Sequence, residues 1–463
     1  ESVDSLRYSV DWLDFGWIDL VKKSANEDIT NGNGCYDIEG AVYGIYSDGV
    51  KVDEITTDKN GYAKSSILPV GNYTVKEISA STGYDLDEES HNVTITKDQT
   101  VRANSDETPG NDPIGIEIVK NDVETLGLPQ GDATLEGAEF TVKYYDGYYT
   151  KDNLPSKATR TWVLTTKERN GKYGAVLSES YKVSGDKIYT DENGGYCLPL
   201  GTISVEETKA PKGYLLKGNT LNVTDTSTGN ISTVKDTNYV AQITKEYQGA
   251  KLQFGNDANQ MVVTEKVKKQ KIQIFKSGYR NGMSEVVKGL QGAEFTFKLK
   301  SEVDHVGWDN ATVYDTITTD ESGWAITKDL PYGEYLVRET VTPKDFYTNP
   351  DFTVSITQDT SEIKKDEDKV KKVILNNRPV ETQLKLVKKD EESGKTVSLN
   401  SASFKIVADE DILDGGNIVY RKGQYITQKV GGKKYDTFTT NSDNVVVVKT
   451  EYTNDDDEKG EVF

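Results

Sequence analysis

The stretch ISVEE at residues 203–207 ends an apolar alternation with a glutamate, and the chain repeats the pattern as YTVKE at 73–77 and YLVRE at 335–339. Successive side chains of a β-strand point to opposite faces, so each final glutamate shares a face with the apolar residues of its own stretch. The sequence therefore predicts three strands, each with an inward glutamate at one end: Glu77, Glu207 and Glu339.

A second strand, upstream of each glutamate strand, places a lysine on the same kind of face. These strands are IDLVK at 18–22, IEIVK at 116–120 and IQIFK at 272–276, and they end at Lys22, Lys120 and Lys276. An unpaired buried charge costs several kcal/mol, so three inward lysines and three inward glutamates are expected to meet as pairs. The alternative is that the lysines reach the sheet edge and form ordinary salt bridges there.

Other landmarks recur in the same order and indicate a repeated all-β unit. A small-residue box, such as EGAEF at 136–140, precedes a D-x-x-G turn and an LP-x-G stretch in each of the first three repeats. Glycine and proline interrupt short β-rich runs, and helical apolar spacing is nearly absent, which is typical of tandem antiparallel β-sandwiches. We expect a lead-in at 1–16, domains at 17–109, 110–259 and 260–379, and a partial domain at 380–463.

Composition narrows the class of protein. The net charge of −21 argues against nucleic acid and anionic membrane surfaces as partners. No apolar stretch is long enough to cross a membrane and no signal peptide is present, so the chain is expected to be a mature or excised segment. The two cysteines, Cys35 and Cys197, fall in different repeats, and a bridge between them stays open.

The second and third repeats also carry an inward asparagine in a closing strand. KLQFGND places Asn256 on the face of Leu252 and Phe254, and KVILNNRP presents Asn377 in the same way. First and last strands of a sandwich can lie side by side. Lys120 is therefore expected beside Asn256, and Lys276 beside Asn377.

This arrangement points to a single covalent reaction within each domain. Burial lowers the pKa of a lysine and raises that of a glutamate, so the amine becomes a nucleophile and the carboxylic acid can polarise the asparagine carboxamide. Attack on Cγ would expel ammonia and leave a Lys–Asn isopeptide bond, once per domain and without turnover. In the first repeat Asn104, Asp106 and Glu107 compete as acceptor for Lys22, and Asn104 is the residue we assign.

The fourth segment carries LKLVKKD with Lys388 but has no LP-x-G stretch and no glutamate strand. Lys388 is therefore expected to have no cross-linking partner within this chain, and the natural protein is expected to continue beyond residue 463.

The ordered set of motifs resembles the SpaA-type pilin and collagen-adhesin B-repeat family of Gram-positive surface proteins, most clearly in VEETKAPKGY at 205–214. The resemblance covers about residues 17–463. It implies Ig-like or prealbumin-like β-sandwiches in tandem, each with a Lys–Asn bond and a catalytic glutamate. It also implies a cell-wall-anchored, extracellular stalk. The chain lacks an LPxTG sorting signal and a reactive lysine in a YPK context, which favours an adhesin stalk over a polymerising pilin.

The sequence thus predicts a structural stalk protein rather than a conventional enzyme, with neighbouring domains of the same chain as its first partners. The alternative is a binding module that contacts a host glycan or extracellular-matrix protein through the Tyr- and Trp-rich insertion at 144–162. No cofactor is expected. DKNG at 58–61 and its two equivalents are interpreted as hairpin turns rather than calcium loops, and no metal site is predicted.

Overall fold

The computed structural model describes residues 13–112, 117–216, 220–224, 231–235, 239–245, 261–278, 289–344 and 346–377, and, towards the C-terminus, 385–395, 402–414, 417–430, 433–439, 445–447, 450–453 and 459–462. The chain divides into two compact units, residues 1–266 and 267–463. The first unit holds two β-sandwich domains, here called domain 1 (13–110) and domain 2 (111–266). The second holds domain 3 (267–377) and a C-terminal segment. No helix among the described residues is both long and apolar enough to cross a membrane.

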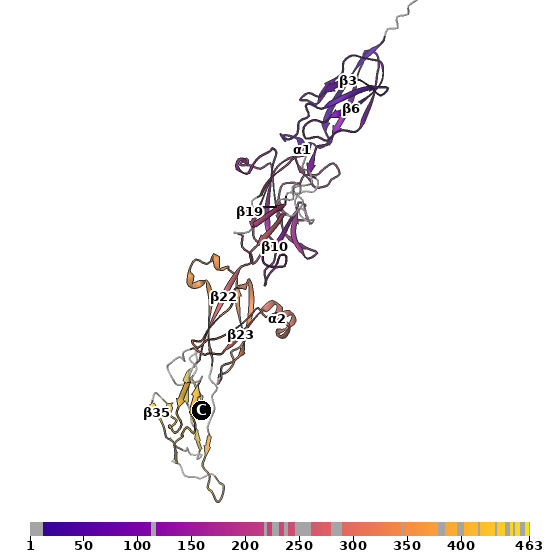
Figure 1. Ribbon diagram of the computed structural model, residues 1–463. Coiled ribbons are helices and arrows are strands. Elements are labelled where there is room, and N and C mark those ends of the chain that lie inside the picture. Colours follow the sequence, from indigo (N-terminus) through magenta and orange to yellow (C-terminus); the bar gives the residue numbers. More distant parts are fainter. Residues whose placement is uncertain are drawn as a thin grey trace, which may run out of the picture. The chain divides into compact units, whose positions relative to one another are not determined.

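Domain 1 is a sandwich of two sheets (Figure 1). In the first sheet, β1 (Phe15–Ser24) pairs with β4 (Tyr62–Lys64), β5 (Leu68–Pro69) and β8 (Thr100–Glu107). The second sheet has the order β3 (Val50–Thr56), β2 (Val42–Ser47), β6 (Gly71–Ser79) and β7 (Ser90–Ile95). Alternate residues of the strands are buried between the sheets, among them Ile18, Leu20, Tyr43 and Val75.

Domain 2 has larger sheets. One has the order β13 (Lys167–Arg169), β14 (Lys172–Val176), β10 (Glu117–Asp122), β21 (Met261–Glu265), β18 (Thr220–Thr224) and β19 (Ile231–Lys235). The other has the order β15 (Lys182–Gly185), β12 (Arg160–Thr165), β11 (Glu139–Tyr145), β17 (Gly201–Lys209) and β20 (Tyr239–Ile243). The short strands β9 (Asn111–Asp112) and β16 (Leu198–Pro199) pair separately.

Domain 3 repeats the plan of domain 1. Its first sheet joins β22 (Lys269–Gly278) to β25 (Trp324–Ile326), β26 (Leu330–Pro331) and β29 (Val370–Asn377). Its second sheet has the order β24 (Asp315–Thr318), β23 (Glu294–Leu299), β27 (Gly333–Val341) and β28 (Phe352–Ile356). The short helix α2 (Lys300–Val306) follows β23.

The described part of the C-terminal segment consists of two-stranded pairs. They are β30 (Lys385–Val387) with β37 (Val445–Val447), β31 (Ser403–Phe404) with β36 (Phe438–Thr439), β32 (Ile412–Asp414) with β33 (Asn417–Tyr420), β34 (Gln428–Val430) with β35 (Lys433–Tyr435), and β38 (Thr450–Thr453) with β39 (Lys459–Val462).

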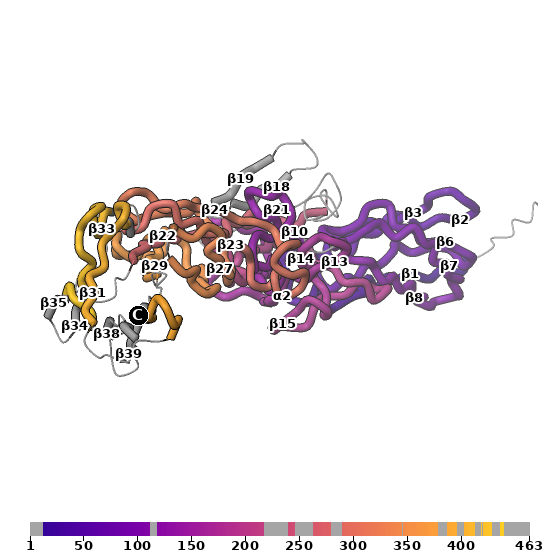
Figure 2. Tube along the Cα trace, turned by 90° about the horizontal axis from the view of Figure 1, so that it is seen from below, coloured from indigo at the N-terminus to yellow at the C-terminus, as the bar shows by residue number. Residues whose placement is uncertain are grey.

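The predicted fold class, all-β tandem sandwiches, is confirmed, with one addition. The first and last strands of each domain pair in parallel: β1 with β8, β10 with β21, and β22 with β29. Figure 2 shows β1 and β8 running side by side, as do β22 and β29. The second domain ends later than the expected residue 259, because β21 belongs to its sheet.

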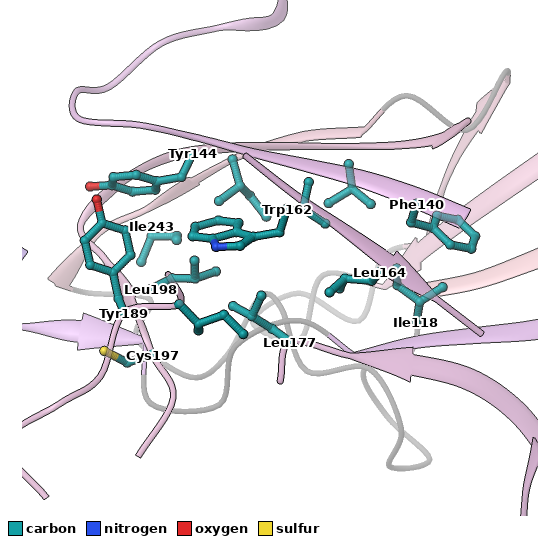
Figure 3. Close-up of a cluster of buried hydrophobic side chains, with 14 of the residues drawn as sticks. Ile118, Phe140, Tyr144, Trp162, Leu164, Leu177, Tyr189, Cys197, Leu198 and Ile243 are labelled. Carbon is teal, nitrogen blue, oxygen red and sulfur yellow. The ribbon is translucent and has the colours of Figure 1, made fainter. Parts of the chain in front are cut away.

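The aromatic residues of the domain 2 insertion form a core instead of an exposed loop. Trp162 and Tyr144 are fully buried, and Tyr189 packs edge-on against both rings (Figure 3). Tyr148 is the large exposed aromatic of this stretch, with 46% of its surface accessible. The expectation of an exposed Tyr- and Trp-rich surface was therefore wrong for most of these residues, because the insertion contributes β12 to the sandwich and turns its aromatic face inward.

A segment of domain 1 packs into the hydrophobic core of domain 2. It includes the short helix α1 (Glu27–Thr30) and runs to Tyr36, and we call it the α1 insert. Its Ile29 and Cys35 belong to the same buried cluster as Trp162 and Cys197. Cys35 and Cys197 are buried thiols, not a disulfide.

Candidate functional site

Each domain holds a fully buried lysine in contact with a fully buried glutamate. The Nζ–Oε1 distances are 3.0 Å for Lys22–Glu77, 2.5 Å for Lys120–Glu207 and 3.1 Å for Lys276–Glu339. None of these six side chains is exposed to solvent. The three Lys–Glu pairs expected from strand alternation thus lie together, and the sheet-edge alternative does not describe them.

The recurrent motifs position these pairs. The phenylalanine of the small-residue box lies beside the lysine in two domains, with Nζ 5.0 Å from the ring centre of Phe140 for Lys120 and 5.2 Å from that of Phe295 for Lys276. The D-x-x-G turn supports the lysine backbone in domains 1 and 3. A Cβ at Gly61, whose φ is +71°, would lie 2.3 Å from the Lys22 carbonyl oxygen, so the turn requires glycine there.

The strand that pairs in parallel with the lysine strand supplies a third residue. This residue pairs in register with the residue two positions after the lysine. It is Glu107 in domain 1, Glu265 in domain 2 and Asn377 in domain 3. All three side chains are buried. The three domains therefore share a Lys–Glu pair but differ at this third position, which is carboxylic acid in two domains and carboxamide in one.

Domain 3 brings together the three predicted residues Lys276, Glu339 and Asn377. Asn377 Nδ2 donates to Glu339 Oε1 over 3.2 Å, and the same oxygen lies 3.1 Å from Lys276 Nζ. One carboxyl oxygen thus lies against both the amine and the carboxamide nitrogen. Burial lowers the pKa of Lys276, although the Glu339 carboxylate opposes the shift, and this favours the neutral amine that a nucleophile requires.

Asn349 also reaches this site, and the sequence analysis did not identify it. Its backbone N–H donates to Glu339 Oε2 over 2.7 Å. In the amide orientation that gives both side-chain atoms a partner, its nitrogen donates to Asn377 Oδ1 over 2.6 Å. Its oxygen then accepts from Lys276 Nζ over 3.2 Å. No strand alternation marks Asn349, because it lies in the loop before β28.

Domain 1 does not bring the assigned acceptor Asn104 to Lys22. Asn104 is exposed on the outer face of β8, while Glu107 lies inside with Oε2 3.1 Å from Lys22 Nζ. Tyr43 and Ser105 donate to Glu107 Oε1 over 2.5 and 2.7 Å. The assignment of Asn104 fails because β8 alternates through Ala103, Ser105 and Glu107. Burial raises the pKa of Glu77, and the Asp87 backbone N–H and Lys22 counter part of that shift.

In domain 2 the assigned acceptor Asn256 lies outside the described residues. The strand that pairs in parallel with β10 is β21, and it brings Glu265 Oε1 to 2.6 Å from Lys120 Nζ. Burial raises the pKa of Glu265, the nearby Glu207 carboxyl raises it further, and Lys120 opposes the shift. Lys120 therefore lies between two acidic side chains.

The remaining predicted positions have simpler surroundings. Lys388 is exposed just after β30. Asp58 and Asp320 accept hydrogen bonds from backbone N–H groups of their own turns, as expected of hairpin turns. Across the parts of the chain that the structure describes, no group of three or more His, Cys, Asp and Glu side chains could hold a metal ion.

Comparison with known proteins identifies the family. A family model described as the SpaA prealbumin-like fold domain matches residues 28–109, 120–239 and 283–370, more than half of the chain. The chain belongs to this family. The resemblance inferred from the ordered motifs is thereby confirmed, as is the prealbumin-like sandwich.

Individual relatives match less of the chain. The chain is 40% identical over 73 residues to the trypsin-resistant surface T6 protein of Streptococcus pyogenes serotype M6. The aligned stretch covers 15% of this chain and 14% of that protein. The TIE protein of Bacillus anthracis is 22% identical with a TM-score of 0.46, covering 79% of this chain and 51% of its own. BcpA, the major pilin subunit of Bacillus cereus, is 16% identical with a TM-score of 0.30, covering 79% of this chain and 100% of its own. The chain thus spans only about half of the TIE protein and a seventh of the T6 protein.

Proposed function

We propose that this chain is part of the stalk of a pilin-like or adhesin-like surface protein of a Gram-positive bacterium. Membership of the SpaA prealbumin-like family and the tandem order of the domains support a structural role outside the cell. The T6 relative is described as a trypsin-resistant surface protein, and we extend both properties to this chain. Cell-wall anchoring and neighbouring domains or subunits as partners belong to the same proposal.

Domain 3 carries the chemical part of the proposal, a Lys276–Asn377 isopeptide bond. The observation behind it is the position of Glu339 Oε1, 3.1 Å from the lysine amine and 3.2 Å from the carboxamide nitrogen. The neutral Lys276 amine attacks Asn377 Cγ, the Cγ–Nδ2 bond breaks, and an Nζ–Cγ bond replaces it. Glu339 takes the proton from Nζ and delivers it to the departing nitrogen, which leaves as ammonia. Each chain reacts once, so no turnover follows.

In domains 1 and 2 we propose that the lysine stays ionic. The group beside it is the carboxyl of Glu107 or Glu265 rather than a carboxamide. A carboxyl group has no ammonia to release, and a lysine that pairs with it as an ammonium is no nucleophile. We therefore propose buried Lys–Glu–Glu contacts in these two domains in place of the Lys22–Asn104 and Lys120–Asn256 bonds, and of the catalytic roles of Glu77 and Glu207, that the sequence predicts.

Intact-mass spectrometry of the whole chain tests the bond. We expect the mass of the sequence less one ammonia, and tandem spectra that join the peptides of Lys276 and Asn377. Glu339→Ala should restore the ammonia, because the group that moves the proton is gone, while Glu207→Ala should leave the single loss unchanged. A wild-type mass equal to the unmodified sequence would sink the proposal. A loss of water would instead report an amide in domain 1 or 2.

Binding to a host glycan or matrix protein remains the second candidate function, on narrower grounds. Most aromatic side chains of the domain 2 insertion are buried, so the surface offered to a ligand there is Tyr148 and its polar neighbours. A binding assay of the whole chain against collagen and a glycan array, with Tyr148→Ala as the variant, tests this candidate.

A further inference from the structure

We propose that Asn349 is a catalytic residue of the domain 3 reaction, one that holds the carbonyl oxygen of Asn377 while Glu339 handles the protons. This inference rests on the proposed Lys276–Asn377 bond and assigns a role within it. Its basis is the contact of the Asn349 side-chain nitrogen with Asn377 Oδ1, at 2.6 Å.

The nitrogen and the oxygen of the Asn377 carboxamide contact different residues. Its nitrogen donates to Glu339 Oε1 at 3.2 Å, whereas its oxygen accepts from Asn349. Glu339 is therefore placed to protonate the leaving nitrogen. The oxygen, where negative charge develops as the amine adds to Cγ, contacts the Asn349 amide instead.

A neutral amide donor suits this position. When Lys276 Nζ adds to Cγ, the carbonyl π electrons move onto Oδ1, which becomes an oxyanion until the Cγ–Nδ2 bond breaks. Preorganised N–H donors aimed at such an oxygen stabilise the transition state more than the ground state. The Asn349 amide supplies one donor and brings no negative charge near the developing oxyanion.

The same side chain also orients the nucleophile. Its oxygen accepts from Lys276 Nζ over 3.2 Å, and its backbone N–H holds Glu339 Oε2 over 2.7 Å. Asn349 thus contacts the nucleophile, the acid–base residue and the electrophile of one reaction. Holding reacting groups in contact in this way supplies part of the acceleration.

Domain 1 provides an internal comparison. Asp87 occupies the equivalent position, since its backbone N–H donates to Glu77 Oε2 over 2.6 Å from ten residues further along the chain, as Asn349 does to Glu339. Its side chain is a carboxylate that contacts His91 and Ser105. Domain 1, which has a carboxyl group in place of the acceptor amide, therefore also lacks the amide donor at this position.

The rate of ammonia loss tests the assignment. Whole chains are synthesised briefly in the cold and then warmed, and the cross-linked fraction is followed by intact mass. For Asn349→Ala we expect the bond to form at a rate about 10²–10³-fold lower than in the wild type, the usual effect of removing one oxyanion donor. Asn349→Asp, which keeps the shape but removes the donor, should be slowed at least as much. Asn376→Ala, an exposed neighbour of the acceptor, should react at the wild-type rate.

Thermal unfolding of variants that cannot form the bond distinguishes a catalytic role of Asn349 from a purely structural one. Glu339→Ala and Glu339→Ala with Asn349→Ala should both stay folded at the temperature of the rate measurement, so a slow reaction in Asn349→Ala does not result from unfolding. Wild-type rates in both Asn349 variants would overturn the inference and leave the Lys276–Asn377 bond standing. A tandem spectrum joining Lys276 to Asn349 would overturn it too, since Asn349 would then be the acceptor. A wild type that never loses ammonia contradicts the bond itself.

Discussion

At the scale of single residues, the side chain at the third position decides what a buried lysine can do. Lys276 has one acidic neighbour, Glu339, and a carboxamide, whereas Lys22 and Lys120 each contact two carboxyl groups. Two ionised carboxylates around one ammonium would leave a buried net negative charge. Burial raises the pKa of Glu77 and that of Glu265, and the second carboxyl of each site raises it further, so one carboxyl of each site favours its protonated form.

Glu265→Asn should convert domain 2 into a cross-linking domain. The substitution puts a carboxamide at the register position that Asn377 occupies, beside a lysine, a glutamate and a phenylalanine that match those of domain 3. We expect the whole chain to lose a second ammonia and tandem spectra to join positions 120 and 265. Adding Glu207→Ala to this variant should return the loss to one. If Glu265→Asn stays at one ammonia, register and burial are insufficient and the reaction needs a further group such as the Asn349 amide.

At the scale of elements, the proposed bond joins two strands that already pair. β22 and β29 run side by side in parallel (Figure 2). They share eight register partners, and Lys276 and Asn377 lie near their C-terminal ends. It would close a loop of about 100 residues, which restricts the unfolded chain by about 4–5 kcal/mol in the loop-entropy description. The bond therefore acts on the free energy of unfolding of domain 3 more than on its folded shape.

Asn377→Ala should lower the thermal midpoint of domain 3 by roughly 20 °C, since about 1 kcal/mol shifts a domain of this size by about 4–8 °C. Calorimetry of the whole chain, with trypsin digestion in parallel, measures the effect. Glu339→Gln should lose a comparable amount because it also fails to react, and Asn376→Ala should lose little. An unchanged midpoint in both unreactive variants would mean that no covalent bond joins the two strands.

The strands and their inward charged residues could be predicted from the sequence, but not every pairing between strands. Alternation in ISVEE and IEIVK was enough to place Glu207 and Lys120 on inner faces, because the period of a strand is two. The closing strand was not determined, since the stretch at 252–256 and β21 both alternate well. Only the pairing with β10 distinguishes them, and it places Glu265 inside. Asn349 was beyond prediction because a loop residue has no periodicity.

At the scale of the whole molecule, domains 1 and 2 share a core. Asn33 of the α1 insert donates to the hydroxyl oxygen of Tyr144 over 2.7 Å and to the Leu200 carbonyl over 3.1 Å. Tyr36 donates to the Gly110 carbonyl over 2.5 Å and accepts from Leu200 N–H over 2.9 Å. The buried Asn33 contacts and the half-buried Tyr36–Leu200 bond reach from domain 1 into domain 2, so opening the junction would expose apolar surface and unpaired polar groups.

Asn33→Ala should loosen this junction, and the rate at which the two cysteines are labelled measures the effect. Removing the Asn33 amide takes the acceptor from the buried Cys35 N–H, and one donor each from the Tyr144 hydroxyl and the Leu200 carbonyl, which still bond each other. We expect a cost of about 1–3 kcal/mol. Cys35 and Cys197 lie in the shared cluster and are the two cysteines of the chain, so the rate of maleimide labelling measures how often the cluster opens. We expect labelling of both thiols to rise by about tenfold or more, since about 1.4 kcal/mol corresponds to a factor of ten. Asn31→Ala, an exposed position of the same insert, should label at the wild-type rate. Equal labelling of the wild type and Asn33→Ala would show that the α1 insert does not hold the two domains together.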